Sequence, residues 1–191
     1  MQEVSRQQFK ELFSDDYDNF LRQLGMEIKI KPIDNDSKVR CYELLSRSNQ
    51  LNLTTHRYSE EDYEHLLKDT HYHCYSVRCK DKFGDYGIIS FISFRLQESS
   101  AIITDFVISC RVAKKKVENA IIRALSRQLS KKGIKELHAF LIITKKNGPL
   151  TDVFRDLPFE VVSKDDKNLH YVMKDLCNVE EQNIIKTSID D

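Results

Sequence analysis

An amphipathic helix between two strand-like segments constrains the fold of this chain more than any other feature. Apolar residues recur at helical spacing from Val117 to Leu129, and the run ends at Lys131-Lys132-Gly133, where cations and glycine favour a helix C-terminus. Strands are predicted at about 100–109 before this helix and at 135–143 after it. Strand, helix and strand in this order predict a crossover between two parallel strands that diverge at their carboxyl ends.

Upstream of the crossover, short connections predict a meander. Strands at 72–81, 86–96 and 100–109 are separated only by 82–85 and by Gln97-Glu-Ser-Ser. The remaining predicted elements are helices over 5–24, 37–49, from Ser59 and at 150–156, and strands at 26–32, 159–163 and 168–174. Together they predict a mixed α/β fold, in which a central sheet carries helices on both faces.

Composition excludes several classes of protein. Lysine plus arginine and aspartate plus glutamate both number 30, so no global basic field favours nucleic acid. No apolar stretch approaches the ~18 residues that a membrane span needs. The five cysteines are an odd number without CxxC spacing, which is typical of reduced thiols and predicts a cytoplasmic protein.

Four sequence blocks carry a resemblance to a known family. They are residues 47–58, 83–87, 109–112 with Val117-Glu118, and 144–149 with Phe154 and Phe159. In this order they resemble the carboxy-terminal part of FkbH-like proteins. The resemblance implies a GNAT-like acyl-CoA N-acyltransferase fold over 26–177.

The same resemblance gives the two ends of the chain a meaning. Residues 1–25 would be a helical linker to a HAD-type domain that the chain lacks, and residues 178–191 a polar tail that frays. Exposed aromatic side chains on the linker would favour a dimer contact.

The segment between the crossover strand and its helix is the first candidate site. In the family, this turn receives the pyrophosphate of coenzyme A, which here implies contacts from Arg111, Val112, Lys114, Lys115 and Lys116. Relatives usually carry glycines at 114 and 116, where φ > 0 or close approach to phosphate is needed. The three lysines could attract phosphate as point charges, or the segment could be a solvated basic turn.

Two further polar groups of residues could contact ligands. Asn147 sits where GNAT proteins place a contact to the pantetheine arm, although Asn147-Gly148-Pro149 is also turn chemistry by itself. The polar loop would overhang the acceptor side of the groove and bind substrate, or would simply be a polar loop. Its candidate residues are Asn49, Gln50, Asn52, Thr54 and Thr55.

Asp105 and Cys110 are the candidate catalytic residues. Asp105 interrupts the apolar strand Ile102-Ile-Thr-Asp-Phe-Val-Ile, where it could be a general base with a raised pKa or could face solvent. Cys110 lies at the end of this strand beside a helix amino terminus, so it could accept an acyl group or be a small buried residue. Tyr171 is the nearest tyrosine after the second crossover strand and could face either way.

No metal site is predicted. His71 and His73 would share one face of a strand while Cys74 points away, so three ligands cannot converge locally.

Two functions follow from these features. The favoured one is an enzyme of GNAT type that handles an acyl group on a pantetheine thioester, either coenzyme A or an acyl carrier protein. The other is a catalytically silent module that docks a carrier protein for a HAD-type partner.

Overall fold

A mixed sheet forms the centre of the molecule, and its strand order determines where the two crossover strands meet. The computed structural model describes residues 2–11, 16–48, 51–145, 147–180 and 183–190. Within these ranges, eight strands hydrogen-bond in the order β6-β7-β5-β4-β3-β2-β1-β8. They are β1 Glu27–Pro32, β2 Tyr72–Asp81, β3 Gly84–Gln97, β4 Ser100–Ile108, β5 Glu136–Ile142, β6 Phe159–Lys164, β7 Asn168–Lys174 and β8 Lys186–Ile189.

The helices begin and end close to the predicted positions. The α-helices are α1 Gln2–Glu11, α2 Tyr17–Leu24, α3 Asn35–Arg47, α4 Glu60–Lys68, α5 Val117–Lys131 and α6 Gly148–Arg155, and the 3₁₀ helices are η1 Cys110–Val112 and η2 Leu176–Asn178. Ser59 caps α4, because its hydroxyl accepts a hydrogen bond from the Asp62 amide at 3.0 Å. In the described ranges, no helix is both long and apolar enough to cross a membrane.

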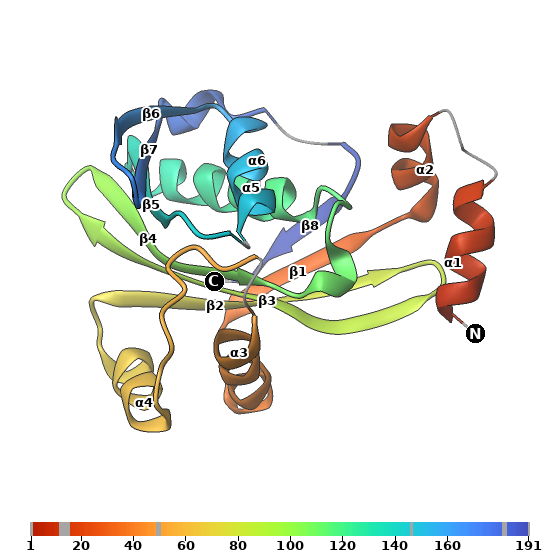
Figure 1. Cartoon of the computed structure of the whole chain (residues 1–191), viewed down its shortest axis with the longest axis horizontal. Coiled ribbons are helices and arrows are strands. Elements are labelled where there is room, and N and C mark those ends of the chain that lie inside the picture. Colours follow the sequence, from red (N-terminus) through yellow and green to blue (C-terminus); the bar gives the residue numbers. More distant parts are fainter. Residues whose placement is uncertain (1, 12–15, 49–50, 146, 181–182, 191) are drawn as a thin grey trace.

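The predicted meander and the predicted crossover are both present. β2, β3 and β4 pair antiparallel in chain order, and α5 then leads to β5, which pairs parallel with β4 (Figure 1). The β4–β5 pairing runs from Ser100 to Ile103 on β4 and from Glu136 to Ala139 on β5, although both strands continue beyond it. The two strands therefore part at their carboxyl ends, as predicted.

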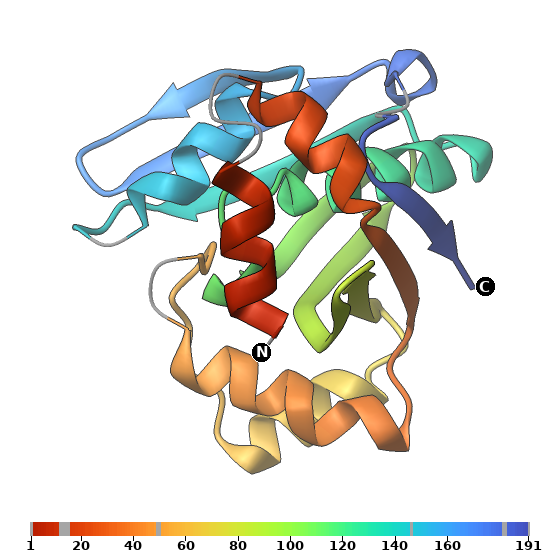
Figure 2. The same cartoon turned by 90° about the vertical axis from the view of Figure 1, so that its right-hand side faces the viewer.

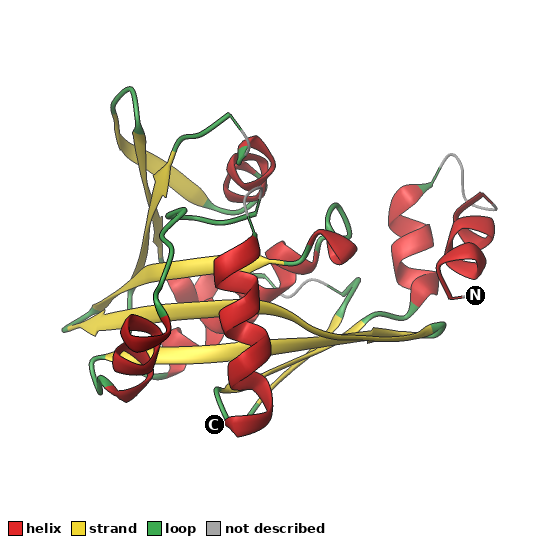
Figure 3. Ribbon diagram, turned by 60° about the horizontal axis from the view of Figure 1, so that its bottom comes forward, coloured by secondary structure: helices red, strands yellow, loops and turns green. Residues whose placement is uncertain are grey.

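Helices cover both faces of the sheet. Figure 1 shows α5 and α6 above the sheet and α3 and α4 below it, and Figure 3 shows the α3–α4 side from the front. The larger apolar core lies on the α5 side and includes Ile121 and Phe106. The smaller core lies on the α3–α4 side and includes Leu44, Phe91 and Val107.

The amino-terminal lead-in forms two helices that pack beside the sheet (Figure 2). α2 buries Phe20, Leu21 and Leu24, which belong to the larger core. Gly25 ends α2 in the left-handed conformation, with φ 63°, which glycine adopts without steric cost. Of the lead-in aromatics, Tyr17 is exposed, whereas Phe13 lies outside the described residues.

The carboxy-terminal segment differs from the expected fraying tail. Lys186 to Ile189 form β8, which pairs parallel with the otherwise open edge of β1. Ile185, just before β8, is buried in the larger core, and that apolar contact stabilises a segment whose other residues are mostly polar.

Candidate functional site

The opening between β4 and β5 is bridged by another part of the chain. The Leu53 amide donates to the Phe106 carbonyl at 3.0 Å, and the Ile108 amide donates to the Leu51 carbonyl at 2.9 Å. On the other side, the Ile142 amide donates to the Leu53 carbonyl at 3.1 Å. This bridging segment, residues 51–53, thus pairs with both strands where they no longer pair with each other. The sequence predicted the opening but not its occupant.

A β-bulge lies where β4 leaves β5. Ser93 of β3 pairs with Asp105, but Phe94 pairs with Ile103, so Thr104 is an extra residue in β4. Ile103 faces the larger core on the α5 side. Because of the bulge, Asp105 faces the opposite side of the sheet, toward α3 and α4. The bulge thus turns a carboxylate toward the side where the predicted acceptor loop lies.

Asp105 is buried, with 2% of its surface exposed, and is surrounded mainly by hydroxyl groups. Its Oδ2 accepts hydrogen bonds from Ser93 Oγ at 2.8 Å and from Tyr58 Oη at 2.9 Å, and the Thr54 side chain also hydrogen-bonds this carboxyl. Burial raises the pKa of Asp105, and the hydroxyl groups and the nearby His56 offset only part of that effect. A carboxylate in this setting can accept a proton more readily than an exposed one.

Tyr58 is a site residue that the sequence analysis did not single out. Its hydroxyl donates to Asp105, and its ring lies edge-on to the exposed His56 ring, with 4.3 Å between centroids. Tyr58 ends the first of the four sequence blocks, and this was the only signal that could have identified it.

The turn after β4 holds two lysines in a backbone conformation that glycine would favour. Lys114 has φ 64° and Lys116 has φ 59°, so both lie in the left-handed region. A non-glycine residue pays roughly 1–2 kcal/mol for this conformation. Positive φ was one of the two reasons considered for glycine at these positions, the other being close approach to phosphate, and both lysines have a positive φ.

Helix α2 of the lead-in contacts the turn after β4 at two of its three lysines. Lys116 Nζ lies 2.6 Å from Asp18 Oδ1, and Tyr17 donates its hydroxyl to the Lys114 carbonyl at 2.7 Å. Lys115 Nζ donates to the Arg111 carbonyl at 2.9 Å, and burial lowers the pKa of this lysine. The exposed Lys114 side chain is therefore the best placed of the three to meet a phosphate.

Glu118 adds a negative group to the first turn of α5. It is buried, and burial raises its pKa to about 7. Near neutral pH this carboxyl is therefore partly protonated, which reduces its repulsion of an anion at the helix amino terminus. No local sequence pattern indicated that this glutamate would be buried.

Asn147 builds the turn after β5. Its Oδ1 accepts from the Thr144 amide at 2.9 Å, and its Nδ2 donates to the Ile142 carbonyl at 2.5 Å. These bonds occupy the amide group, so contact with a pantetheine arm stays a prediction. Tyr171 is buried and stacks on Phe154 with 4.9 Å between ring centroids, which assigns it to the core.

Cys110 is exposed rather than buried, and it lines a cavity of about 550 Å³ between α3 and the end of β4. The cavity has three guanidinium groups, from Arg40, Arg47 and Arg111, and one carboxylate, from Glu43. Glu43 is paired with Arg40 at 2.7 Å. The cavity therefore has an excess of positive charge.

The polar loop lies at the opening between β4 and β5, where residues 51–53 bond both strands. Asn49 and Gln50 lie outside the described residues. Asn52 is buried, and its Oδ1 accepts from the Thr55 amide at 2.9 Å. Thr55 itself has φ 56°, which is a strained conformation for a β-branched residue. Of the five loop candidates, the structure brings Thr54 against Asp105.

No family model and no curated protein matches the sequence. Solved structures are similar to more than three quarters of the chain. The ribosomal-protein-S18-alanine N-acetyltransferase from Escherichia coli aligns with a TM-score of 0.59 and 11% identity, over 77% of this chain and 93% of that one. The spermidine N-acetyltransferase from Vibrio cholerae, in complex with CoA and spermine, aligns with a TM-score of 0.60 and 9% sequence identity. This alignment covers 80% of this chain and 99% of that one.

Two other structures extend the comparison. The PaiA N-acetyltransferase from Thermoplasma acidophilum, in complex with coenzyme A, aligns with a TM-score of 0.54 and 14% sequence identity, over 78% of this chain and 99% of that one. The GNAT domain of S. lividans PAT aligns with a TM-score of 0.56 and 12% sequence identity, over 76% of this chain and 89% of that one. The chain therefore has the GNAT N-acetyltransferase fold.

Proposed function

We propose that this chain transfers an acyl group from a pantetheine thioester to an amine, with Asp105 as the general base. The observation that carries the proposal is the position of Asp105. It is a buried carboxyl two residues beyond the last residue of β4 that pairs with β5, and among the described residues it forms no ion pair. Perturbed carboxyls in such openings are candidates for proton transfer. The structures with this fold that contain coenzyme A support this donor class.

The chemistry needs one proton acceptor at this point. The amine nitrogen attacks the thioester carbonyl carbon, the C–N bond forms and the C–S bond breaks. The amine proton passes to the Asp105 carboxylate, and the thiolate leaves with the pantetheine arm. Tyr58 holds the carboxylate in place through its hydrogen bond.

The turn after β4 would hold the diphosphate of coenzyme A. Its left-handed residues, Lys114 and Lys116, place backbone amides at the start of α5, where the helix dipole favours an anion. The exposed Lys114 ammonium adds a point charge.

The proposal is tested by calorimetric titration with acetyl-coenzyme A. We expect saturable binding that weakens as salt is raised over 0.05–0.5 M, because the screening length falls below ~10 Å. Lys114→Ala should weaken binding by up to about fivefold, which corresponds to one exposed charge contact. Lys135→Ala, an exposed lysine beyond α5, is the matched control and should bind like the parent. Absence of binding in the parent would contradict the proposal.

The bridging segment favours a second candidate function. If residues 51–53 stay in the opening, the chain cannot admit a pantetheine arm there, and the fold would serve only as a docking module. The three arginines around the cavity between α3 and β4 would suit an acidic acyl carrier protein. The four blocks that resemble FkbH-like proteins favour this context, in which a HAD-type partner would perform the chemistry.

Carrier-protein binding separates the two functions. A docking module should bind the apo and holo forms of an acyl carrier protein equally, because it does not use the pantetheine arm. An acyltransferase should prefer the holo form. Arg47→Gln should weaken carrier binding in both cases, whereas the exposed control Arg22→Gln should not.

A further inference from the structure

Residues 51–58 contact both the opening between β4 and β5 and the carboxyl group of Asp105. The backbone groups of Leu51 and Leu53 hydrogen-bond the free backbone edges of β4 and β5. Thr54 and Tyr58 hydrogen-bond Asp105. The same short stretch of chain therefore fills the opening and supplies part of the surroundings of the candidate base. A displacement of the bridging segment would therefore also move residues that contact Asp105.

A ligand that pairs with the strand edges must compete with the bridging segment. The Ile108 amide and the Ile142 amide each carry one hydrogen, and they donate to the carbonyls of Leu51 and Leu53. A pantetheine arm has two amides and would need the same backbone groups. Both leucine side chains are buried, so an incoming arm must also replace their apolar contacts.

The bridging segment is held by bonds that could release. Asn52 ties it down, because its Oδ1 accepts from the Thr55 amide and its Nδ2 donates to the Ser48 carbonyl at 3.4 Å. Thr55 opposes these bonds, because a β-branched residue with φ 56° is strained and gains by leaving this conformation.

We propose that the pantetheine arm displaces the bridging segment, and that this displacement draws Thr54 away from Asp105, so that the base is released only when the donor is bound. The inference rests on the proposed function and specifies its order: donor first, then acceptor. Asn52 and Thr54 are then positioning residues, which act through the segment and through Asp105.

A reversible cross-link tests the displacement. Asn52 and Val107 are antiparallel bridge partners, and such partners lie about 4.5–5.5 Å apart at Cα, within the range of a disulfide. Asn52→Cys with Val107→Cys would lock the segment when oxidised, in a Cys110→Ser, Cys177→Ser background that removes the two exposed thiols. Acetyl-coenzyme A is the probe, because it has no free thiol. The reduced form should bind it at least a hundredfold more tightly than the oxidised form.

A simpler variant protects the test against misfolding of the cross-linked chain. Asn52→Ala removes the two bonds that tie the segment down, and acetyl-coenzyme A affinity should rise up to about tenfold. Hydrogen exchange reports the movement directly. On addition of acetyl-coenzyme A, the Leu53 amide should lose protection, while the Ser109 amide, which donates to Ile89 of β3 at 2.7 Å, should not change.

The link to the base has its own signature. Thr54→Val without donor should reproduce the shift of the Asp105 carboxyl carbon that acetyl-coenzyme A causes in the parent, and the donor should then add little. If the oxidised and reduced forms bind equally, or if the Leu53 amide stays protected, the displacement is refuted while the proposed function stands. If the parent does not bind acetyl-coenzyme A, the proposed function fails and the displacement with it.

Discussion

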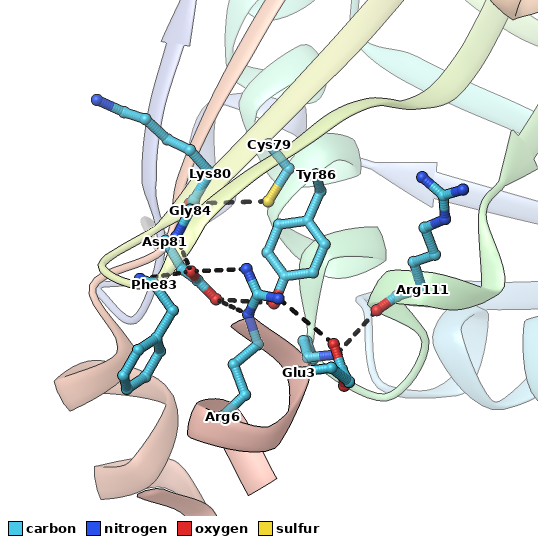
Figure 4. Close-up of polar contacts among 10 residues, drawn as sticks. Glu3, Arg6, Cys79, Lys80, Asp81, Phe83, Gly84, Tyr86 and Arg111 are labelled. Carbon is cyan, nitrogen blue, oxygen red and sulfur yellow. Dashed lines mark hydrogen bonds and ion pairs between the residues drawn. The ribbon is translucent and has the colours of Figure 1, made fainter. Parts of the chain in front are cut away.

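Two aspartates are buried in this molecule in contrasting ways. Asp81, at the end of β2, has a side chain with no exposed surface, and it accepts hydrogen bonds from Arg6 at 2.7 and 3.0 Å and from Tyr86 at 2.7 Å. Figure 4 shows both groups converging on this carboxylate, which also accepts from the Phe83 and Gly84 amides. Asp105 has hydroxyl donors and, within the part of the chain that the structure describes, no guanidinium pairs with it.

The pKa values of the two carboxyls move in opposite directions. Burial alone would raise the pKa of Asp81, but the bonds from Arg6, Tyr86 and Phe83 outweigh it, so the pKa is lowered. At Asp105 burial prevails and the pKa is raised. A buried carboxylate matched by a cation fastens helix α1 to the sheet. One without a cation is free to exchange a proton.

The largest expected effect is on catalysis at Asp105. Asp105→Asn removes the proton acceptor but keeps a carbonyl oxygen for Ser93 and Tyr58, so acyl transfer should fall about 10²–10⁴-fold. Release of coenzyme A from acetyl-coenzyme A, followed by chromatography with a panel of amines, measures this. The exposed Asp166→Asn is the matched control and should leave the rate unchanged. An active Asp105→Asn variant would remove the base from the mechanism.

The largest expected effect on stability is at the other aspartate. Arg6→Met leaves Asp81 buried without its cation, which should lower the free energy of unfolding by about 3–5 kcal/mol. Asp105→Asn should change it by only about 1 kcal/mol, because its hydrogen-bond acceptor remains. Urea unfolding of both variants makes the comparison. Equal destabilisation would mean that the two sites do not differ as described.

A smaller effect is expected in the turn after β4. Glycine adopts left-handed backbone without the steric cost that lysine pays, so Lys114→Gly and Lys116→Gly should each raise the free energy of unfolding by about 1 kcal/mol. Lys132, with φ −88°, provides the control, and Lys132→Gly should give no gain. A loss of stability at 114 or 116 would show that the lysine side chains matter more than the backbone strain.

The smallest effects are the pH dependences, and they have opposite signs. The raised pKa of Asp105 favours folding below the ordinary value of about 3.9, and this contribution is lost as pH rises through the folded pKa. The lowered pKa of Asp81 favours folding above the ordinary value, and this is lost as pH falls through the folded pKa.

Unfolding free energies measured from pH 3 to 7 should reveal both contributions. As pH rises from 4, the free energy of unfolding of Asp105→Asn should increase relative to that of the parent. The free energy of unfolding of Arg6→Met should decrease relative to that of the parent. Parallel curves for the two variants would contradict the assigned pKa directions.

Periodicity was enough to predict the meander, the crossover and the parting of β4 and β5, because each depends on local patterns and short connections. It also indicated Asp105 as a polar residue in an apolar strand. It did not predict which way Asp105 faces, because a one-residue bulge at Thr104 reverses simple alternation. Nor could it find the Arg6–Asp81 pair, whose members are 75 residues apart.

The bridging segment and β8 were missed for a related reason. Leu51 and Leu53 stand among polar residues and look like part of a loop, although each forms backbone bonds to strands far along the chain. β8 is mostly polar and depends on the open edge of β1. Both gain their structure from partners that no local pattern specifies.

The central claim is that Asp105 is a buried acid at the proposed donor site, whereas Asp81 is a structural anion held by Arg6. Carboxyl-carbon NMR of the aspartates, titrated from pH 3 to 8 with and without acetyl-coenzyme A, tests this most directly. We predict that Asp105 titrates above its ordinary range and that its resonance shifts when the donor is added, while Asp81 titrates below its ordinary range. An Asp105 resonance that titrates like an exposed aspartate, or that ignores the donor, would contradict the claim.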